Sequence, residues 1–143
     1  MATELGVVAV HPVRTRRCDA TELSPGRLAR WRRVADEAAR QCGRARVPEV
    51  AEVVRLDALA WPGALLVADP FAEATLADVV ADLDREAISA VTVVTGPEGG
   101  LAPEEVAALV ARGGRTVALG RRVLRAETAP VAVAAALLAW DGS

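Results

Sequence analysis

The stretch Ala90-Val91-Thr92-Val93-Val94-Thr95-Gly96-Pro97-Glu98-Gly99-Gly100 decides the fold, because in it a strand pattern passes directly into a stiff loop. Residues 90–95 are rich in β-branched side chains, which is typical of a strand buried on both faces of a sheet. Residues 96–100 contain three Gly and one Pro, so backbone N–H and C=O groups of this loop are open to a ligand. By itself the loop fits an ordinary strand-to-helix connection equally well. Glu98 favours a ligand site, because a carboxylate between glycines has no packing role.

Strand and helix patterns alternate along the rest of the chain. Strands are expected at residues 7–13, 65–68, 90–95 and 116–119, and helices at residues 24–42, 75–83, 103–112 and 127–140. Ser24 as N-cap and Pro25 in the first turn begin the first helix, and Gly43 ends it. Because strands alternate with helices, we predict an α/β fold with a mostly parallel sheet and helices on both faces. Such sheets bind ligands at the carboxyl ends of their strands, where the glycine loop lies.

The first helix has one apolar face. Residues at helical spacing form it: Leu28, Trp31, Val34, Ala35, Ala38 and Ala39. We expect this face to pack in the core, Trp31 included, although Trp31 also suits stacking on a base. The strand at residues 7–13 is likewise expected to be buried, with His11 in a structural role.

Composition limits the classes of function. The 143 residues fit one domain, and 52% of them are apolar but only 3% aromatic, so aliphatic side chains must form the core. No apolar run approaches the roughly 18 residues that span a bilayer, and residues 1–6 lack signal-peptide features, so a cytoplasmic protein is expected. All 17 basic residues are Arg, which excludes the GxxxxGK[ST] phosphate loop. His11 is the only His, which excludes an HExxH site, and no metal is expected.

Positive charge is concentrated in the first third of the chain. Ten Arg residues lie within residues 1–46, whereas acidic residues dominate residues 49–86, and the net charge is −2. This asymmetry suggests a face that meets an anion, since Arg can donate two N–H groups to one phosphate and stack on a base. A solvated helix face would explain the same pattern without an anionic partner.

A second polar loop precedes the last helix: Leu119-Gly120-Arg121-Arg122-Val123-Leu124-Arg125-Ala126-Glu127-Thr128-Ala129. Apolar Val123 and Leu124 interrupt this loop, and Glu127 or Thr128 suits the N-terminal end of a helix. Because the loop also follows a predicted strand, we expect it at the same sheet edge as the glycine loop.

Together these residues resemble the SPOUT-class ribosomal RNA small subunit methyltransferase E family, which methylates N3 of a uridine in 16S ribosomal RNA. The motifs, in order, are Gly96-Pro97-Glu98-Gly99-Gly100, Glu104-Glu105, Leu119-Gly120, Leu124-Arg125 and Glu127-Thr128-Ala129. The front half agrees, through Thr3-Glu4-Leu5-Gly6-Val7, Arg17, Trp31, Glu37-Ala38, Gln41, Arg44 and Val47-Pro48. The resemblance covers essentially the whole chain, so residues 1–143 are interpreted as one methyltransferase domain. The family's amino-terminal RNA-binding β-barrel domain is expected to be absent.

The resemblance implies a carboxyl-terminal trefoil knot, S-adenosylmethionine bound in that knot, and a homodimer. It places the cofactor at residues of both loops: Thr95, Gly96, Pro97, Gly99, Leu119, Gly120, Val123, Leu124, Arg125, Thr128 and Ala129. Glu98 and Arg125 are the expected catalytic residues. Glu98 would take or relay the uridine N3 proton, and Arg125 would stabilise negative charge on the uracil oxygens. For either residue, a salt bridge that only shapes its loop is the other interpretation.

Small-subunit ribosomal RNA is the expected partner. Arg side chains of the front half are the expected phosphate contacts: Arg14, Arg16, Arg17, Arg27, Arg32 and Arg44. Two other functions remain open, namely a related knotted methyltransferase that acts on transfer RNA and a binding module whose catalysis is impaired without a partner domain. Pro130 is compatible with the last helix only if that helix begins near Glu127, because first-turn N–H groups have no helical partner.

Overall fold

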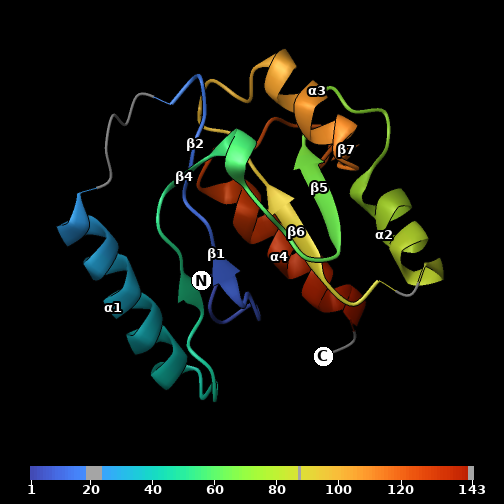
Figure 1. Cartoon of the computed structure of the whole chain (residues 1–143). Helices are drawn as coiled ribbons and strands as arrows, with labels where there is room; N and C mark the ends of the chain where they lie inside the picture. The colour runs from blue at the N-terminus through green and yellow to red at the C-terminus, as the bar shows by residue number, and fades with distance from the viewer. Residues whose placement is uncertain (19–23, 87, 142–143) are drawn as a thin grey trace.

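The computed structural model describes residues 1–18, 24–86 and 88–141, and its helices and strands alternate along the chain (Figure 1). The strands are β1 (Ala9–Val10), β2 (Val13–Arg14), β3 (Glu49–Val50), β4 (Val54–Arg55), β5 (Ala64–Ala68), β6 (Val91–Val94) and β7 (Arg115–Val117). The helices are α1 (Pro25–Gln41), α2 (Leu76–Arg85), α3 (Pro103–Ala111) and α4 (Thr128–Asp141), with a 3-10 turn, η1 (Leu56–Ala58). No helix within the described residues is long and apolar enough to cross a membrane.

A parallel sheet with the strand order β6-β5-β7 forms the centre of the fold. Successive residues of β5 face opposite sides of this sheet. Leu65 and Val67 share a buried cluster with Leu109 of α3, whereas Leu66 shares one with Val79 of α2. Helices therefore cover both faces, and the predicted α/β class with parallel strands is confirmed. The threading of the carboxyl-terminal segment through a loop stays a prediction.

The front half forms two separate pairs of short parallel strands, β1 with β3 and β2 with β4. The expected single strand at residues 7–13 is wrong, because Pro12 has no N–H with which to continue a ladder between β1 and β2. The expected burial is wrong as well, since Val8 is 74% and Val10 is 38% exposed. β3 and β4 escape prediction because two residues are too few to show an alternating pattern.

Helix α1 begins and ends where the sequence predicts. The Ser24 hydroxyl accepts a hydrogen bond from the Arg27 N–H (3.3 Å). Gly43 follows the helix with a φ of +74°, a left-handed conformation that glycine adopts without strain. Capping residues in the sequence therefore fixed both ends of the helix.

The apolar face of α1 is only partly buried. Leu28, Ala35 and Val50 of β3 form one buried cluster. Trp31 is 40% exposed and Val34 is 54% exposed, so the expected core positions of these two residues are wrong. The reason is the place of α1 at one edge of the molecule, where only its side toward β3 is covered (Figure 1).

Strand β6 is less buried than its sequence predicts. Val91 and Val93 are half-buried, and only Val94 is buried. The cause is the position of β6 at the edge of the central sheet. Burial on both faces belongs instead to β5, whose Leu66 and Val67 have no exposed surface, because this strand lies between two others.

Helix α4 connects the two halves of the fold. It begins at Thr128, so Pro130 falls in the first turn, as its lack of an N–H requires. Val133 is fully buried at 1% exposure. Farther along the helix, Leu138 Cδ1 would lie 3.8 Å from a Cβ added to Gly6, so α4 reaches the N-terminal segment.

Thr75 and Asp78 cap the N-terminal end of α2. The Thr75 hydroxyl accepts from the Asp78 N–H (3.3 Å), and Asp78 Oδ2 accepts from the Thr75 N–H (3.0 Å). Hydrogen bonds from the hydroxyl and from the N–H of Thr75 hold the pKa of the Asp78 carboxyl below its usual value.

We predict that Thr75→Ala lowers the free energy of unfolding by about 1 kcal/mol, because α2 loses its cap. Chemical denaturation measures the change, and Thr75→Ser, which keeps the hydroxyl, is the matched control. Because the folded pKa of Asp78 is lowered, its stabilising effect is present at neutral pH and is lost as the pH falls through that folded pKa. The difference between Thr75→Ala and wild type should therefore shrink in acid, and equal stability at neutral pH would contradict the capping role.

Candidate functional site

Three loops leave the carboxyl ends of the central strands. Residues 95–102 follow β6, residues 118–127 follow β7, and residues 69–75 follow β5. Because the strands are parallel and paired side by side, these loops share one edge of the sheet. The third loop carries no recognisable motif, so only the central position of β5 adds it to the candidate site.

The loop after β5 is fixed to the chain that follows β7. The Asp69 N–H donates to the Val117 C=O (3.0 Å), and the Ala118 N–H donates to the Ala74 C=O (2.9 Å). Asp69 Oδ1 also accepts from the N–H of Phe71 (2.9 Å), whose side chain is 90% exposed. These bonds make the loop a fixed part of the edge.

Glycine is required at two positions of the loop after β6. A Cβ at Gly96 would lie 2.8 Å from the backbone nitrogen of Leu101, closer than real Cβ contacts. Gly100 has a φ of +71°, and its N–H closes a turn onto the Pro97 C=O (2.8 Å). Glu98 occupies the tip of this turn, exposed, and its carboxylate has no hydrogen-bond or ion-pair partner among the described residues.

The segment after β2 clamps this glycine loop from outside. The Arg17 guanidinium donates through Nη1 to the Gly99 C=O (2.9 Å). Glu105 of α3 accepts from the Arg16 N–H at Oε1 (2.8 Å) and from the Ala102 N–H at Oε2 (2.9 Å). One carboxylate thus joins the front half of the chain to the loop that precedes α3.

The loop after β7 supplies apolar surface beside open backbone. Leu119 and Leu124 are half-buried, and Ala129 at the start of α4 is buried. Gly120 has a φ of +135°, so this position also favours glycine. Val123 is 79% exposed and packs little against the protein, which leaves its side chain open to a ligand.

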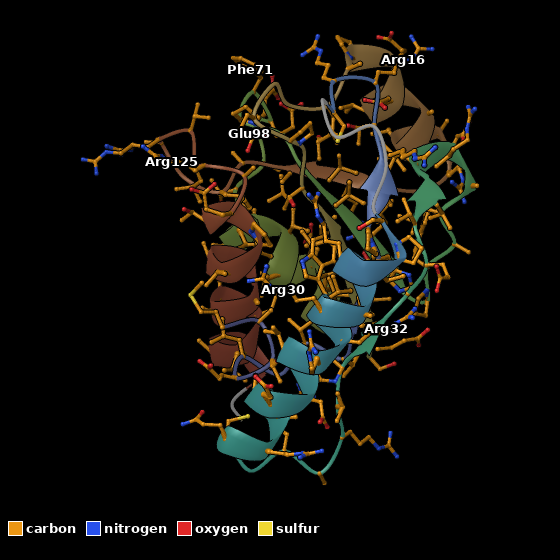
Figure 2. All side chains as sticks on the ribbon, turned by 90° about the vertical axis from the view of Figure 1, so that its left-hand side faces the viewer. Arg16, Arg30, Arg32, Phe71, Glu98 and Arg125 are labelled. Atoms are coloured by element: carbon orange, nitrogen blue, oxygen red, sulfur yellow. The ribbon has the colours of Figure 1, made fainter. Side chains whose placement is uncertain are left out.

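The two expected catalytic residues are not in contact. Arg125 lies 3.9 Å from Glu127, and this ion pair is 85% and 68% exposed, so it holds Arg125 weakly. Figure 2 shows the Arg125 side chain extended into solvent and directed away from Glu98. The backbone C=O of Arg125 accepts from the Thr128 N–H (2.9 Å), which fixes the start of α4 but not the guanidinium.

Four of the six expected RNA-contacting arginines already donate within the chain. Arg16 and Arg17 take part in the clamp described above. Arg32 donates to the Val50 C=O (3.0 Å) and pairs with Glu52 (2.7 Å). Arg44 donates to the C=O groups of the N-terminal turn, including that of Val7 (2.7 Å).

Arg14 and Arg27 differ from those four. Their guanidinium groups make no hydrogen bond or ion pair with any residue of the described ranges. Sequence patterns carry no signal for this distinction, since all six side chains are exposed or partly exposed arginines in one Arg-rich segment.

The residues at this edge fit the adenine and ribose of S-adenosylmethionine. The fit consists of glycine backbone without side chains at Gly96 and Gly120 and apolar side chains at Leu119 and Leu124. Among the described residues, no group of three or more His, Cys, Asp or Glu could hold a metal ion. The edge therefore suits a planar organic ligand held by backbone groups.

We predict that Gly96→Ala weakens binding of S-adenosylmethionine at least roughly tenfold, because the new Cβ forces the loop backbone to move. Isothermal titration calorimetry measures the affinity. Gly26→Ala is the matched control, since a Cβ at this glycine in the first turn of α1 meets nothing within 4 Å and should leave the fold and the affinity unchanged. Unchanged affinity in a folded Gly96→Ala protein would exclude this loop from the cofactor site.

We also predict that Arg17→Ala weakens binding of the cofactor, because the Gly99 C=O loses the donor that fixes it. Arg17→Lys keeps one charged donor and should restore part of the affinity. Arg33→Ala, a change of an exposed arginine on α1, is the control. A cofactor affinity that is equal in all four proteins would show that the clamp does not act on the loop.

Comparison with known proteins agrees with this geometry. The family model of the RNA methyltransferase domain matches residues 1–138. The ribosomal RNA small subunit methyltransferase E of Mycobacterium bovis is 36% identical over 160 residues, which cover 100% of this chain and 59% of that protein. The protein of the same name from Synechocystis is 36% identical over 136 residues, covering 90% of this chain and 43% of that protein. This chain thus spans about three fifths or less of these relatives.

Solved structures agree in fold. The ribosomal RNA small subunit methyltransferase E of Neisseria gonorrhoeae, bound to S-adenosyl methionine, superposes with a TM-score of 0.84 at 34% identity, covering 96% of this chain and 57% of that one. A putative methyltransferase of Legionella pneumophila in complex with the same cofactor gives a TM-score of 0.81 at 28% identity, with 96% and 57% covered. The resemblance inferred from the motifs is confirmed, and the chain belongs to the RNA methyltransferase domain family.

Proposed function

We propose that this protein transfers a methyl group from S-adenosylmethionine to RNA, and that its target is N3 of a uridine in small-subunit (16S) ribosomal RNA. The glycine loop carries the proposal, because at the carboxyl edge of a parallel sheet a Cβ at Gly96 would collide with backbone and Gly100 has a left-handed φ that other residues rarely adopt. Relatives that bind S-adenosyl methionine share this fold.

The cofactor would be held mainly by backbone groups. Thr95, Gly96 and Gly99 would contact it from one loop, with Pro97 stiffening that loop. Residues of the second loop and the start of α4 would complete the site: Leu119, Gly120, Val123, Leu124, Arg125, Thr128 and Ala129. When bound, S-adenosylmethionine supplies a methyl group on a positively charged sulfur. The protein's task is then to orient the acceptor, and positioning of this kind can supply roughly 7–11 kcal/mol of a barrier.

Glu98 and Arg125 would act on the uridine. The Glu98 carboxylate is exposed and unpaired among the described residues, so it is available to accept the N3 proton. Arg125 would stabilise the negative charge that appears on the uracil oxygens. Its exposed pair with Glu127 costs little to open, since such pairs contribute about 0–1 kcal/mol.

Ribosomal RNA would meet the arginine-rich front half. Arg14 and Arg27 are the first candidates for phosphate contacts, because their guanidinium groups have no partner within the described residues. Arg16, Arg17, Arg32 and Arg44 would use donors left over from their internal bonds, since each guanidinium carries five. We further propose a homodimer in the cytoplasm, with residues 1–143 as one domain. Apolar side chains left exposed on α1, such as Trp31 and Val34, support a subunit contact.

Methyl transfer to purified ribosomal subunits tests the function. We expect radiolabel from S-adenosylmethionine in small subunits, with 3-methyluridine identified by mass spectrometry after nuclease digestion, and none in transfer RNA. If radiolabel appears only in transfer RNA, transfer RNA and not ribosomal RNA is the substrate. Cofactor binding without any transfer would indicate a binding module, and absence of cofactor binding would overturn the proposal.

Arg125→Ala should lower kcat by about 10²–10³, because one charge-stabilising group is lost in the transition state. Cofactor affinity should change little, since the proposed contact of Arg125 with the cofactor is through the backbone. Arg125→Lys keeps the charge and should recover part of kcat. Full turnover by a folded Arg125→Ala protein would exclude the catalytic role.

A further inference from the structure

We propose that a cleft between β2, β4 and α3, lined by no residue of either cofactor loop, binds phosphate groups of the RNA backbone. The cleft has a volume of about 480 Å³, and its charged residues include Arg14, Arg16, Arg55 and Arg112. None of the lining residues belongs to the glycine loop or to residues 119–129. The inference rests on the proposed function in taking RNA as the ligand, and it adds Arg55 and Arg112 to the substrate surface.

The register of two strands creates the central feature of the cleft. β2 and β4 are parallel, and Arg14 is the Cα partner of Arg55. Two guanidinium groups thus project from paired positions, where like charges are destabilising. An anion between them would remove this repulsion and would contact both side chains at once.

Asp57 only partly compensates this pair of charges. It accepts from Arg55 Nε (3.0 Å) and Nη2 (2.6 Å), while Arg14 has no partner among the described residues. The pair is bidentate, but its side chains are 76% and 60% exposed, so water and salt screen it and other anions can reach Arg55. A phosphate would therefore compete with Asp57 for the donors of Arg55.

Two further arginines face the same cleft. Arg112, the residue that follows α3, donates to the C=O groups of Leu59 (2.7 Å) and Asp57 (3.4 Å), and its guanidinium carbon lies 4.3 Å from the centre of the Trp61 ring. These contacts orient Arg112 but do not neutralise its charge. Arg16 forms an ion pair with Glu104.

The carboxylates of the cleft are already engaged. Asp57 and Glu104 each pair with an arginine, and Glu105 accepts two backbone N–H groups. Four guanidinium groups and three carboxylates line the cleft, so its side chains carry one excess positive charge. Thr15 also lines the cleft, and its hydroxyl oxygen is buried without a hydrogen-bond partner in the described structure.

The position of the cleft suits a strand of RNA that continues from the cofactor edge. Glu105 contributes to the wall of the cleft and to the clamp on the glycine loop. Arg14 also lines a second hollow, of about 210 Å³, beside the start of α1. The surface from α3 past β2 to α1 thus carries arginines along its length, as contact with successive phosphates requires.

The salt dependence of RNA binding tests the proposal. We would measure binding of a labelled small-subunit RNA fragment by fluorescence anisotropy from low to high KCl. Arg14→Ala and Arg55→Ala should each reduce the slope of log K against log[salt] by about 0.7–0.9, which is roughly fivefold in affinity near 0.15 M salt. Arg46→Ala, at an exposed position in the connection between α1 and β3, is the matched control and should leave the slope unchanged.

Asp57→Asn should change RNA affinity in the opposite direction. An increase in affinity could not be explained by misfolding of the variant. The substitution frees Arg55 without removing a positive charge, so RNA should bind more tightly and with a steeper salt dependence. Wild-type slopes in Arg14→Ala and Arg55→Ala, or weaker RNA binding by Asp57→Asn, would overturn the proposal. Titration with inorganic phosphate, followed by calorimetry, separates the two sources of the anion. If phosphate binding depends on Arg14 and Arg55 but the salt dependence of RNA binding does not, the assignment of RNA as the ligand is overturned.

Methyl transfer by the wild type, measured alongside, separates this inference from the proposed function. If the wild type transfers the methyl group but the variants keep the wild-type salt dependence of RNA binding, only the proposed role of the cleft is overturned. RNA binding through the cleft without transfer supports the cleft and contradicts the proposed reaction.

Discussion

The parallel pairing of β5 with β6 on one side and β7 on the other is the constraint on which the rest of the structure depends. It brings three loops to one edge of the sheet although residues 76–94 separate the first from the second and residues 103–117 separate the second from the third. It also determines which helix covers each face of the sheet, because alternate residues of β5 point to opposite faces and pack against α2 or α3. The proposed cofactor site is a consequence of that pairing, since neither the glycine loop nor the loop after β7 forms a site alone.

A single carboxylate then connects this edge to the front half of the chain. Glu105 binds two backbone N–H groups, one beside the glycine loop and one beside Arg17. The bond from the Ala102 N–H is partly buried, and leaving such an N–H without an acceptor costs about 1–3 kcal/mol, more than an exposed ion pair contributes. The glycine loop is therefore shaped from two directions: internally by its required glycines and externally by Arg17.

The arginines of the front half have different roles. Arg17, Arg32 and Arg44 hold backbone carbonyl groups and so maintain the fold. Arg14 has no such contact in the described residues, and its strand register sets it beside Arg55. A net charge of −2 is thus compatible with a phosphate-binding surface, because local arrangement rather than the total charge determines where an anion binds.

The sequence alone determined the α/β class, the ends of α1 and α3, the place of Pro130 in a first turn, and the two loops with their glycines. Each follows from local chemistry: caps, turn residues and the alternation of strand and helix patterns. Other features depend on neighbours distant in the chain. The exposure of Trp31 and Val34, the edge position of β6, the third loop after β5 and the internal bonds of Arg17 were decided only by the tertiary structure. A local pattern specifies what a residue can do, whereas burial and partners depend on which segment packs against it.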